Sequence, residues 1–281
     1  MTPKYLVINA DDFGLDSAVN EAIIELFQIQ KISSISLAAN GQAFDQAARF
    51  AKTFNLDVGI HLTLVGEKPL ADTEQIKSLV GSDRHFFKNR YIFLQRYGCG
   101  IIRKSEVVHE WSLQFQKIIN AGLSISHLDS HQHLHMLPGL FEIALQLGRE
   151  YHVHFIRLTR FFQPRFNPFK LGVNLCSRID ARLLRKHQTL KSLDRYWGMD
   201  QSGRLNKEIW RQFIKQCRPG TQEIMCHPGK RNNVLKKHYQ WPFDWEKEYR
   251  TQLGLDLQRL LDEERIRLVS YAGLMKGNIL S

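Results

Sequence analysis

Short apolar runs alternate along the chain with longer segments whose apolar residues recur at helical spacing. Residues 5–9 form the first apolar run, and residues 19–27 then carry apolar side chains three or four positions apart. The first pattern is typical of a buried strand and the second of an amphipathic helix. Further strands are predicted over residues 35–39, 56–62, 125–129, 153–158, 223–226 and 267–271. Further helices are predicted over residues 44–54, 105–121, 138–150, 206–216 and 248–261.

This alternation of about seven strands with helices predicts one α/β domain over residues 1–281. Strands that are separated by helices pair in parallel through right-handed crossovers. Seven such units favour a closed or nearly closed (β/α) barrel, with an open doubly wound sheet as the alternative. Residues 66–103 and 159–203 show no clear period, and we expect both to be insertions near the active-site rim.

Polar residues follow four of the predicted strands at the point where each strand ends. The clusters are Asn9-Ala10-Asp11-Asp12, Gly59-Ile60-His61, residues 127–135 and Met225-Cys226-His227-Pro228-Gly229. In both candidate folds the active site lies beyond the carboxyl ends of the strands. The sequence therefore predicts one site assembled from segments that are far apart along the chain.

The residue types in these clusters suit a divalent metal ion. One carboxylate and two imidazoles leave coordination positions for water and substrate, which is typical of catalytic metal sites. Adjacent strand residues point to opposite faces, so Asp11 and Asp12 can share a site only if the chain turns there, as Phe13-Gly14 permits. One carboxylate would then bind the metal and the other would act as a base. The alternative is a solvated turn that caps the next helix.

The stretch over residues 127–135 is unusually rich in histidine. Five of its residues share parity, so an extended chain would place them on one face. They are His127, Asp129, His131, His133 and His135. One or two of them can bind a metal, and the others would orient the ligands or contact substrate. The alternative is a polar surface loop.

Two further histidines follow predicted strands. His61 comes after Gly59-Ile60, and its alternative role is that of a packed core histidine. His227 precedes Pro228-Gly229, which would expose its ring at the same rim. A histidine with a pKa of about 6.5 can protonate a leaving group near neutral pH. The alternative for His227 is a packed rim residue.

The chain is basic, with 39 Lys and Arg against 28 Asp and Glu and a formal charge of +11. Cations and phenylalanines are interleaved over residues 157–186, a pattern that suits an anionic lipid or a nucleic acid. The alternative is a second small core with a solvated face. These cations do not lie on a recognised nucleic-acid-binding helix or strand, so no nucleic-acid partner is expected. The interleaved residues are Arg157, Arg160, Phe161, Phe162, Arg165, Phe166, Phe169, Lys170, Arg178, Arg182, Arg185 and Lys186.

Compartment signals in the sequence are those of a cytoplasmic protein. Its four cysteines form no C-x-x-C pair, which argues against disulfides and a cysteine zinc site. The N-terminus enters a strand-like run directly, and no apolar stretch is long enough for a membrane span. Any membrane contact is therefore expected to be peripheral, at the inner surface.

The four clusters resemble those of the YdjC-like carbohydrate deacetylases, a group that includes chitooligosaccharide deacetylases and hopanoid-associated deacetylases. The resemblance covers most of the chain and rests on residues 7–15, 59–62, 127–136 and 225–229. It implies a polysaccharide-deacetylase-like (β/α) barrel that hydrolyses the N-acetyl group of an amino sugar. The two insertions look more similar to the hopanoid-associated branch.

The resemblance also implies residue roles. Asp12, His61 and His131 would hold one divalent ion, zinc or magnesium, with Asp11 as the base and His227 as the general acid. The substrate would be an acetylated amino sugar on a glycolipid or an oligosaccharide, and the products acetate and a free amine. Hydrolysis of a phosphoester or a cyclic amide is the alternative, because such a site is not specific for acetamides. A homodimer and a peripheral membrane contact stay open.

Overall fold

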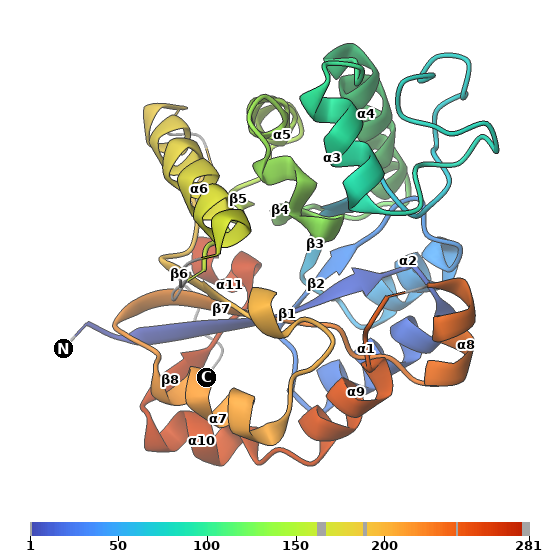
Figure 1. Ribbon diagram of the computed structural model, residues 1–281. Coiled ribbons are helices and arrows are strands. Elements are labelled where there is room, and N and C mark those ends of the chain that lie inside the picture. The colour runs from blue at the N-terminus through green and yellow to red at the C-terminus, as the bar shows by residue number, and fades with distance from the viewer. Residues whose placement is uncertain (1, 162–166, 188–189, 240, 277–281) are drawn as a thin grey trace.

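The computed structural model describes residues 2–161, 167–187, 190–239 and 241–276, in which eight strands form one curled sheet (Figure 1). The strands are β1 (Lys4–Phe13), β2 (Ser34–Leu37), β3 (Val58–Leu62), β4 (His127–Ser130), β5 (Phe155–Ile156), β6 (Arg195–Trp197), β7 (Gly220–Cys226) and β8 (Ile266–Leu268). Every pairing is parallel, in the order β5-β4-β3-β2-β1-β7-β6, with β8 beside the first residues of β1. The predicted α/β barrel is confirmed, as a half-barrel that stays open between β5 and β6.

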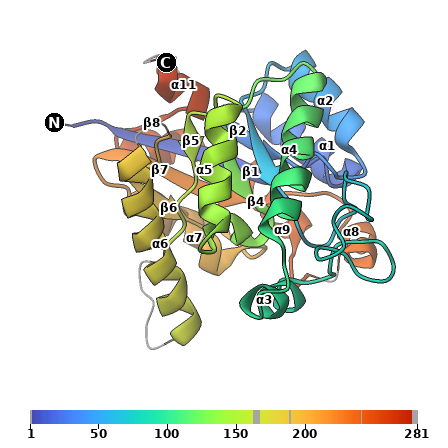
Figure 2. The same ribbon diagram turned by 90° about the horizontal axis from the view of Figure 1, so that it is seen from above.

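Five helices lie where the apolar spacing predicts them, and they flank the sheet (Figures 1 and 2). They are α1 (Ser17–Gln28), α2 (Phe44–Thr53), α4 (Lys104–Asn120), α5 (Leu140–Glu150) and α7 (Lys207–Lys215). The Asp16 side chain caps α1 by accepting a hydrogen bond from the Ala18 N–H at 2.7 Å. This cap satisfies one of the N–H groups that the start of every helix leaves unpaired.

The C-terminal region differs from the prediction. The single helix expected over residues 248–261 is two helices, α9 (Trp245–Leu253) and α10 (Leu257–Glu263), because Gly254 ends the first and Asp256 caps the second. The strand expected over residues 267–271 stops early, since α11 (Tyr271–Lys276) begins there.

Both stretches without a clear period contain regular structure. Residues 66–103 include α3 (Arg90–Gly98), and residues 159–203 include α6 (Pro168–His187), β6 and the short helix η2 (Met199–Gln201). Leu171 and Leu175 of α6 are exposed, so apolar residues lie on more than one side of this helix and blur its period. Strand β6 has only two apolar residues, Tyr196 and Trp197, and they follow Asp194 and Arg195, so no apolar run marks it. The sequence pattern also misses α8 (Asn232–His238) and the 3-10 helix η1 (His131–Met136).

Strand β1 lies at the centre of the sheet, and its residues from Leu6 to Phe13 are buried. The polar clusters thus project from a rigid support. Gly59 in β3 is required by close packing, since a Cβ atom there would collide with the His127 ring of β4.

Candidate active site

The end of β1 brings two adjacent carboxylates to one place. Its pairing with β2 shifts register between Ala10 and Phe13, and Asp12 has a φ of 66°. This bulge breaks the alternation of side chains, so Asp11 and Asp12 both come close to His61 of β3. The turn that a shared site requires is therefore present. Positive φ is tolerated best by Asn and Asp among residues other than glycine.

Asp12 lies between two histidine rings. Its Oδ1 atom is 3.3 Å from Nε2 of His61 and 3.2 Å from Nδ1 of His131, which begins η1 directly after β4. One ligand atom from each residue lies within 4.8 Å of the others, and all three residues are buried. The second oxygen, Oδ2, is buried without a hydrogen-bond partner among the described residues. An unpartnered carboxylate oxygen beside two imidazoles fits a divalent cation.

The charges of this group depend on each other. Burial raises the pKa of Asp12, but hydrogen bonds from His131 and His61 outweigh it and hold that pKa well below its usual range. Burial lowers the pKa of His61, but Asp129 and Asp12 raise it to about 10. A protonated imidazole cannot coordinate, so a cation that binds here must displace the His61 proton.

A second ionic group surrounds Arg157, the residue that follows β5. The Arg157 guanidinium lies 2.7 and 2.8 Å from the two oxygens of Asp11, 2.8 Å from Asp129 and 2.5 Å from Glu223 of β7. All four side chains are buried. Burial lowers the pKa of Arg157, but Asp11 and Asp129 more than compensate and raise it well above its usual value. A buried charge needs such partners, and here they fix the orientation of the Asp11 carboxylate.

Asp129 joins the two groups. Its Oδ1 atom is 2.6 Å from Nδ1 of His61, which turns Nε2 of that ring toward Asp12. Its Oδ2 atom accepts a hydrogen bond from Ser36 Oγ at 2.7 Å. A carboxylate behind a histidine ligand fixes its tautomer and ring orientation. The position of Asp129 is that of a residue that orients a ligand.

The other histidines of residues 127–135 do not share one face. The chain leaves β4 after Ser130, and Gln132 and His133 have φ values of 53° and 56°, so the extended arrangement expected from parity is not formed. His133 lines the cavity described below and lies 3.3 Å from the Tyr196 hydroxyl.

His127 and His135 lie in the core. The His127 ring stacks on Tyr271, with centroids 4.0 Å apart, and burial lowers its pKa to about 4. The His135 ring lies 2.6 Å from Ser130 Oγ and 2.9 Å from the Arg157 carbonyl oxygen, and burial lowers its pKa to about 4 too. Neither ring lines the cavity, so the structure offers these two residues supporting positions.

A cavity of about 450 Å³ opens beside the Asp12 group. His61, His131 and Asp11 lie at its base, and the segments of both expected insertions contribute to its walls. Trp241 and Phe243 form an aromatic side, with the Trp241 ring 4.7 Å from that of His131. Other lining residues are Asn89, Arg90, Tyr91, Ser130, Gln132, His133, Phe161, Lys170, Met199, Asp200, Ser202, Met225, His227 and Pro242.

His227 lies directly after β7 on this cavity. Its backbone N–H donates to Glu248 at 2.7 Å, and its ring packs 4.9 Å from Phe243. The Nδ1 atom is buried without a hydrogen-bond partner among the described residues. The ring is thus held in place with a nitrogen that no described residue engages.

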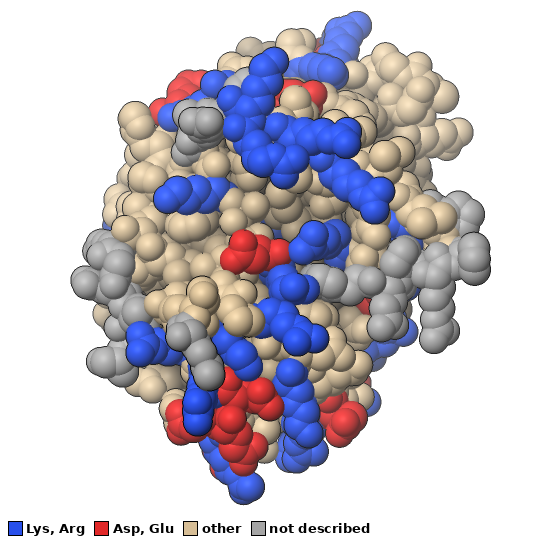
Figure 3. All heavy atoms as spheres, turned by 90° about the vertical axis from the view of Figure 1, so that its left-hand side faces the viewer, with Lys and Arg blue, Asp and Glu red and all other residues tan. Residues whose placement is uncertain are grey.

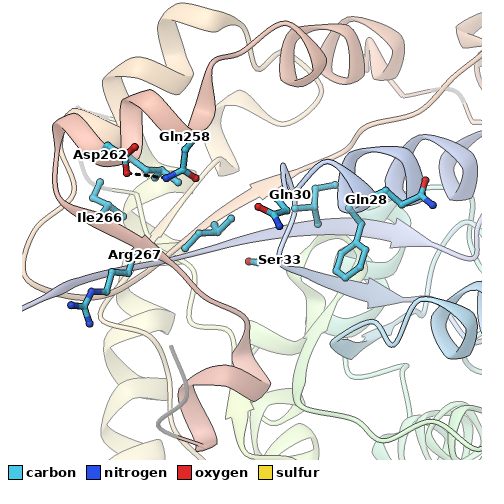
Figure 4. A pocket seen from close by; sticks show the side chains of 11 residues that line it. Gln28, Gln30, Ser33, Gln258, Asp262, Ile266 and Arg267 are labelled. Carbon is cyan, nitrogen blue, oxygen red and sulfur yellow. Dashed lines mark hydrogen bonds between the residues drawn. The ribbon is translucent and has the colours of Figure 1, made fainter. Parts of the chain in front are cut away.

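A second hollow, of about 760 Å³, lies at the opposite ends of the strands, among α1, α10 and β8 (Figure 4). Gln28, Gln30 and Ser33 line it with a hydrogen-bonded pair, Gln258 and Asp262. No histidine is among its lining residues, so it lacks the donor set of the first cavity.

Sequence reasoning missed the residues that organise the site from below. Arg157 follows a strand, as the four polar clusters do, but it also begins the basic stretch, whose pattern predicts a lipid-facing or solvated surface. That prediction is wrong for Arg157, because this residue is buried among carboxylates. Glu223 shares parity with Met225 and His227, which was a usable signal. Phe162, Arg165 and Phe166 lie outside the described residues, and Phe161 is buried.

One carboxylate and two imidazoles lie at the strand ends of an α/β half-barrel, beside an open cavity, and this donor set suits enzymes with a catalytic divalent ion, hydrolases among them. The sequence matches the family described as YdjC-like protein over residues 5–263, and the chain belongs to that family.

Two known relatives match this chain over most of their own length. A carbohydrate deacetylase of Geobacillus stearothermophilus is 31% identical over 231 residues, which cover 81% of this chain and 80% of that protein. Another, from Clostridium beijerinckii, is 25% identical over 268 residues, covering 95% and 98%. A crystal structure from Enterococcus faecalis, described as that of a cellobiose-phosphate cleavage protein, superposes with a TM-score of 0.82 at 25% identity, covering 97% of this chain and 99% of that one.

Proposed function

We propose that this protein is a carbohydrate deacetylase that uses one divalent ion to remove the N-acetyl group from an amino sugar, releasing acetate and a free amine. The observation that carries this proposal is the Asp12–His61–His131 group, with an unpartnered carboxylate oxygen, at the base of an open cavity. The named relatives that match most of the chain are carbohydrate deacetylases, which supports the same reaction.

Asp12, His61 and His131 would hold the ion. A bound divalent ion supplies Lewis-acid polarisation of the acetamide carbonyl and lowers the pKa of water. Two imidazoles among three ligands favour zinc over magnesium, so we propose zinc.

The chain's own residues supply the proton transfers. Asp11 lines the cavity and accepts the proton of the attacking water, while Arg157 holds both of its oxygens in place. The Oδ1 atom of Asp11 also accepts a hydrogen bond from Asn9 Nδ2 at 2.8 Å, whereas Oδ2 keeps a lone pair beyond the one that faces Arg157, so Asp11 can still act as a base through Oδ2. His227, fixed by Phe243 and by Glu248 at its backbone, donates a proton to the departing amine.

The aromatic side of the cavity supports a sugar substrate, because Trp241 and Phe243 offer flat apolar faces beside the reacting group. Within the described residues, no helix is long and apolar enough to cross a membrane. We propose an amino sugar with a lipid aglycone, as in the hopanoid-associated branch of the family. The cytoplasmic location and the homodimer stay predictions from the sequence.

The direct test is acetate release from a panel of N-acetylated oligosaccharides and N-acetylated glycolipids. The protein is first stripped of metal with a chelator and then reloaded with zinc or with magnesium. We expect acetate from at least one amino sugar with the reloaded protein and none with the stripped protein. Phosphate release from a phosphoester in the same panel, without acetate, would replace the proposed reaction with the alternative one.

A further inference from the structure

Helix α6 presents an outer face of apolar and cationic side chains. Leu171, Leu175 and Ile179 are 50%, 59% and 39% exposed and follow each other at intervals of four residues. Exposed cations lie beside them on the same helix: Arg178, Arg182, Arg185 and Lys186. Asp180 is the one acidic residue in the α6 sequence, and it is buried. A helix face of this composition is typical of segments that lie in the plane of an anionic membrane surface.

A hollow of about 750 Å³ adjoins this face, and we call it the basic hollow. Its lining includes five arginines that come from α6, from the segment after β5 and from β6: Arg160, Arg178, Arg182, Arg185 and Arg195. Asp194 is the one acid among its lining residues, and its carboxylate already accepts hydrogen bonds from the N–H and Oγ1 of Thr221 at 2.8 and 2.9 Å. Lys and Arg side chains gather over the side of the molecule that carries α6 (Figure 3).

The arginines of the basic hollow repel one another. Burial and the nearby positive charge of Arg195 lower the pKa of Arg160. Arg178, Arg182 and Arg185 form no ion pair within the described part of the chain. A phosphate group would relieve this repulsion, and its oxygens match the fork of guanidinium donors.

The helix and the hollow both adjoin the mouth of the deacetylase cavity. Phe161 lines the basic hollow and the cavity, so the two share a wall. Tyr91, at the start of α3, also lines the cavity and is 67% exposed, and its neighbour Ile92 is 41% exposed. Figure 2 shows α3 and the first part of α6 projecting from the same side of the molecule. Exposed apolar residues therefore flank two sides of the cavity mouth.

We infer that the protein docks on an anionic phospholipid bilayer through α6, with Leu171, Leu175 and Ile179 entering the headgroup layer and lipid phosphates entering the basic hollow. This docking would turn the cavity mouth toward the bilayer and bring it to the sugar headgroup of a glycolipid. That consequence rests on the proposed function, but the docking itself does not. The phenylalanines of the basic stretch are not needed, because the exposed apolar contacts come from leucine and isoleucine.

The test is co-sedimentation of the full chain with vesicles, in the absence of any acetylated sugar. Vesicles of phosphatidylcholine alone are compared with vesicles containing 30 mol% phosphatidylglycerol, a composition of about one anionic lipid in three, at low and high salt. We expect binding to the anionic vesicles that falls as salt rises, and binding to the neutral vesicles at least about tenfold weaker.

Matched variants locate the surface. Arg178→Glu/Arg182→Glu should weaken binding to anionic vesicles by about 30-fold or more, since each cation contributes about a fivefold effect. Lys236→Glu/Lys237→Glu makes the same charge change on α8, across the molecule, and should leave most of the binding intact. Leu171→Ser/Leu175→Ser should weaken binding by about tenfold. Its control, Ile29→Ser/Ile119→Ser, removes one exposed isoleucine just after α1 and another from α4.

Three results would overturn the inference: no binding to anionic vesicles, equal loss in the α6 and α8 variants, or retention by duplex DNA without vesicle binding. The last result would assign α6 to a nucleic-acid partner. Thermal unfolding curves of all variants check that each is folded. Acetate release from soluble oligosaccharides reports on the proposed function separately, so either proposal can fail alone.

Discussion

The active-site region holds two neighbouring ionic groups, one around Asp12 and one around Arg157, which differ in how fully their polar atoms are hydrogen-bonded. Around Arg157, each guanidinium donor and carboxylate faces a partner at 2.5–3.0 Å. Around Asp12, the closest distances are 3.2 and 3.3 Å, and Oδ2 has no partner among the described residues. A satisfied group of buried charges positions its members, whereas an unsatisfied one has capacity for a ligand. This difference indicates that the Asp12 group binds the metal ion and that the Arg157 group fixes the side chains around it.

The largest expected effect on activity comes from variants of the Asp12 group. His61→Ala or His131→Ala should remove most bound metal and lower the rate of acetate release by about 10⁴-fold or more, because a three-ligand site rarely survives the loss of one ligand. Metal content by mass spectrometry and acetate release test this together. Full metal occupancy in either variant would remove that histidine from the ligand set.

The two neighbouring aspartates should respond differently. Asp11→Asn should keep the metal and lower the rate by about 10³-fold, because a base is required for proton transfer and not for coordination. Asp12→Asn is the matched variant one residue along, and it should lose metal and activity. Equal metal loss in both variants would contradict the separation of binding and positioning groups.

Removal of the cation from the Arg157 group should lower the free energy of unfolding. Arg157→Met leaves Asp11, Asp129 and Glu223 as buried carboxylates without their cation, and removal of one partner from a buried ion pair costs about 3–5 kcal/mol. Urea unfolding measures the loss. The control is Arg218→Met, at an exposed position outside this group, which should change the free energy of unfolding by less than about 1 kcal/mol. Similar values for the two variants would show that the Arg157 contacts do not stabilise the fold.

The smallest expected effect is the loss of unfolding free energy at acid pH that comes from a buried histidine. The folded-state pKa of His135 is about 4 and its ordinary value is about 6.5, so the unfolded chain binds more protons between these pH values. The stabilisation is complete above about pH 6.5 and falls by about 3 kcal/mol as pH drops to about 4. His135→Gln should therefore lose less unfolding free energy than wild type between pH 7 and 4.5. The exposed control, His154→Gln, should behave like wild type.

The sequence predicts the strands and the polar clusters at their ends because each of them is marked by residues that are adjacent in the chain. It cannot predict the position of His135, because parity assumes an extended chain and η1 interrupts it. Arg157 is missed for another reason: its partners Asp11 and Glu223 are 146 and 66 residues away, and only the sheet order brings them together. Long-range pairing of this kind leaves no periodic trace.

The measurement that tests the central claim most directly is the position of a bound zinc ion by anomalous X-ray diffraction from crystals of the metal-loaded protein. The account predicts one peak between the Asp12 carboxylate and the rings of His61 and His131. The alternative cluster offered by the fold is Asp11, His61 and Asp129, whose ligand atoms also lie within 4.8 Å of one another. A peak at this second cluster, or no peak at either place, would contradict the assignment of Asp12 as a ligand and of Asp11 as the base.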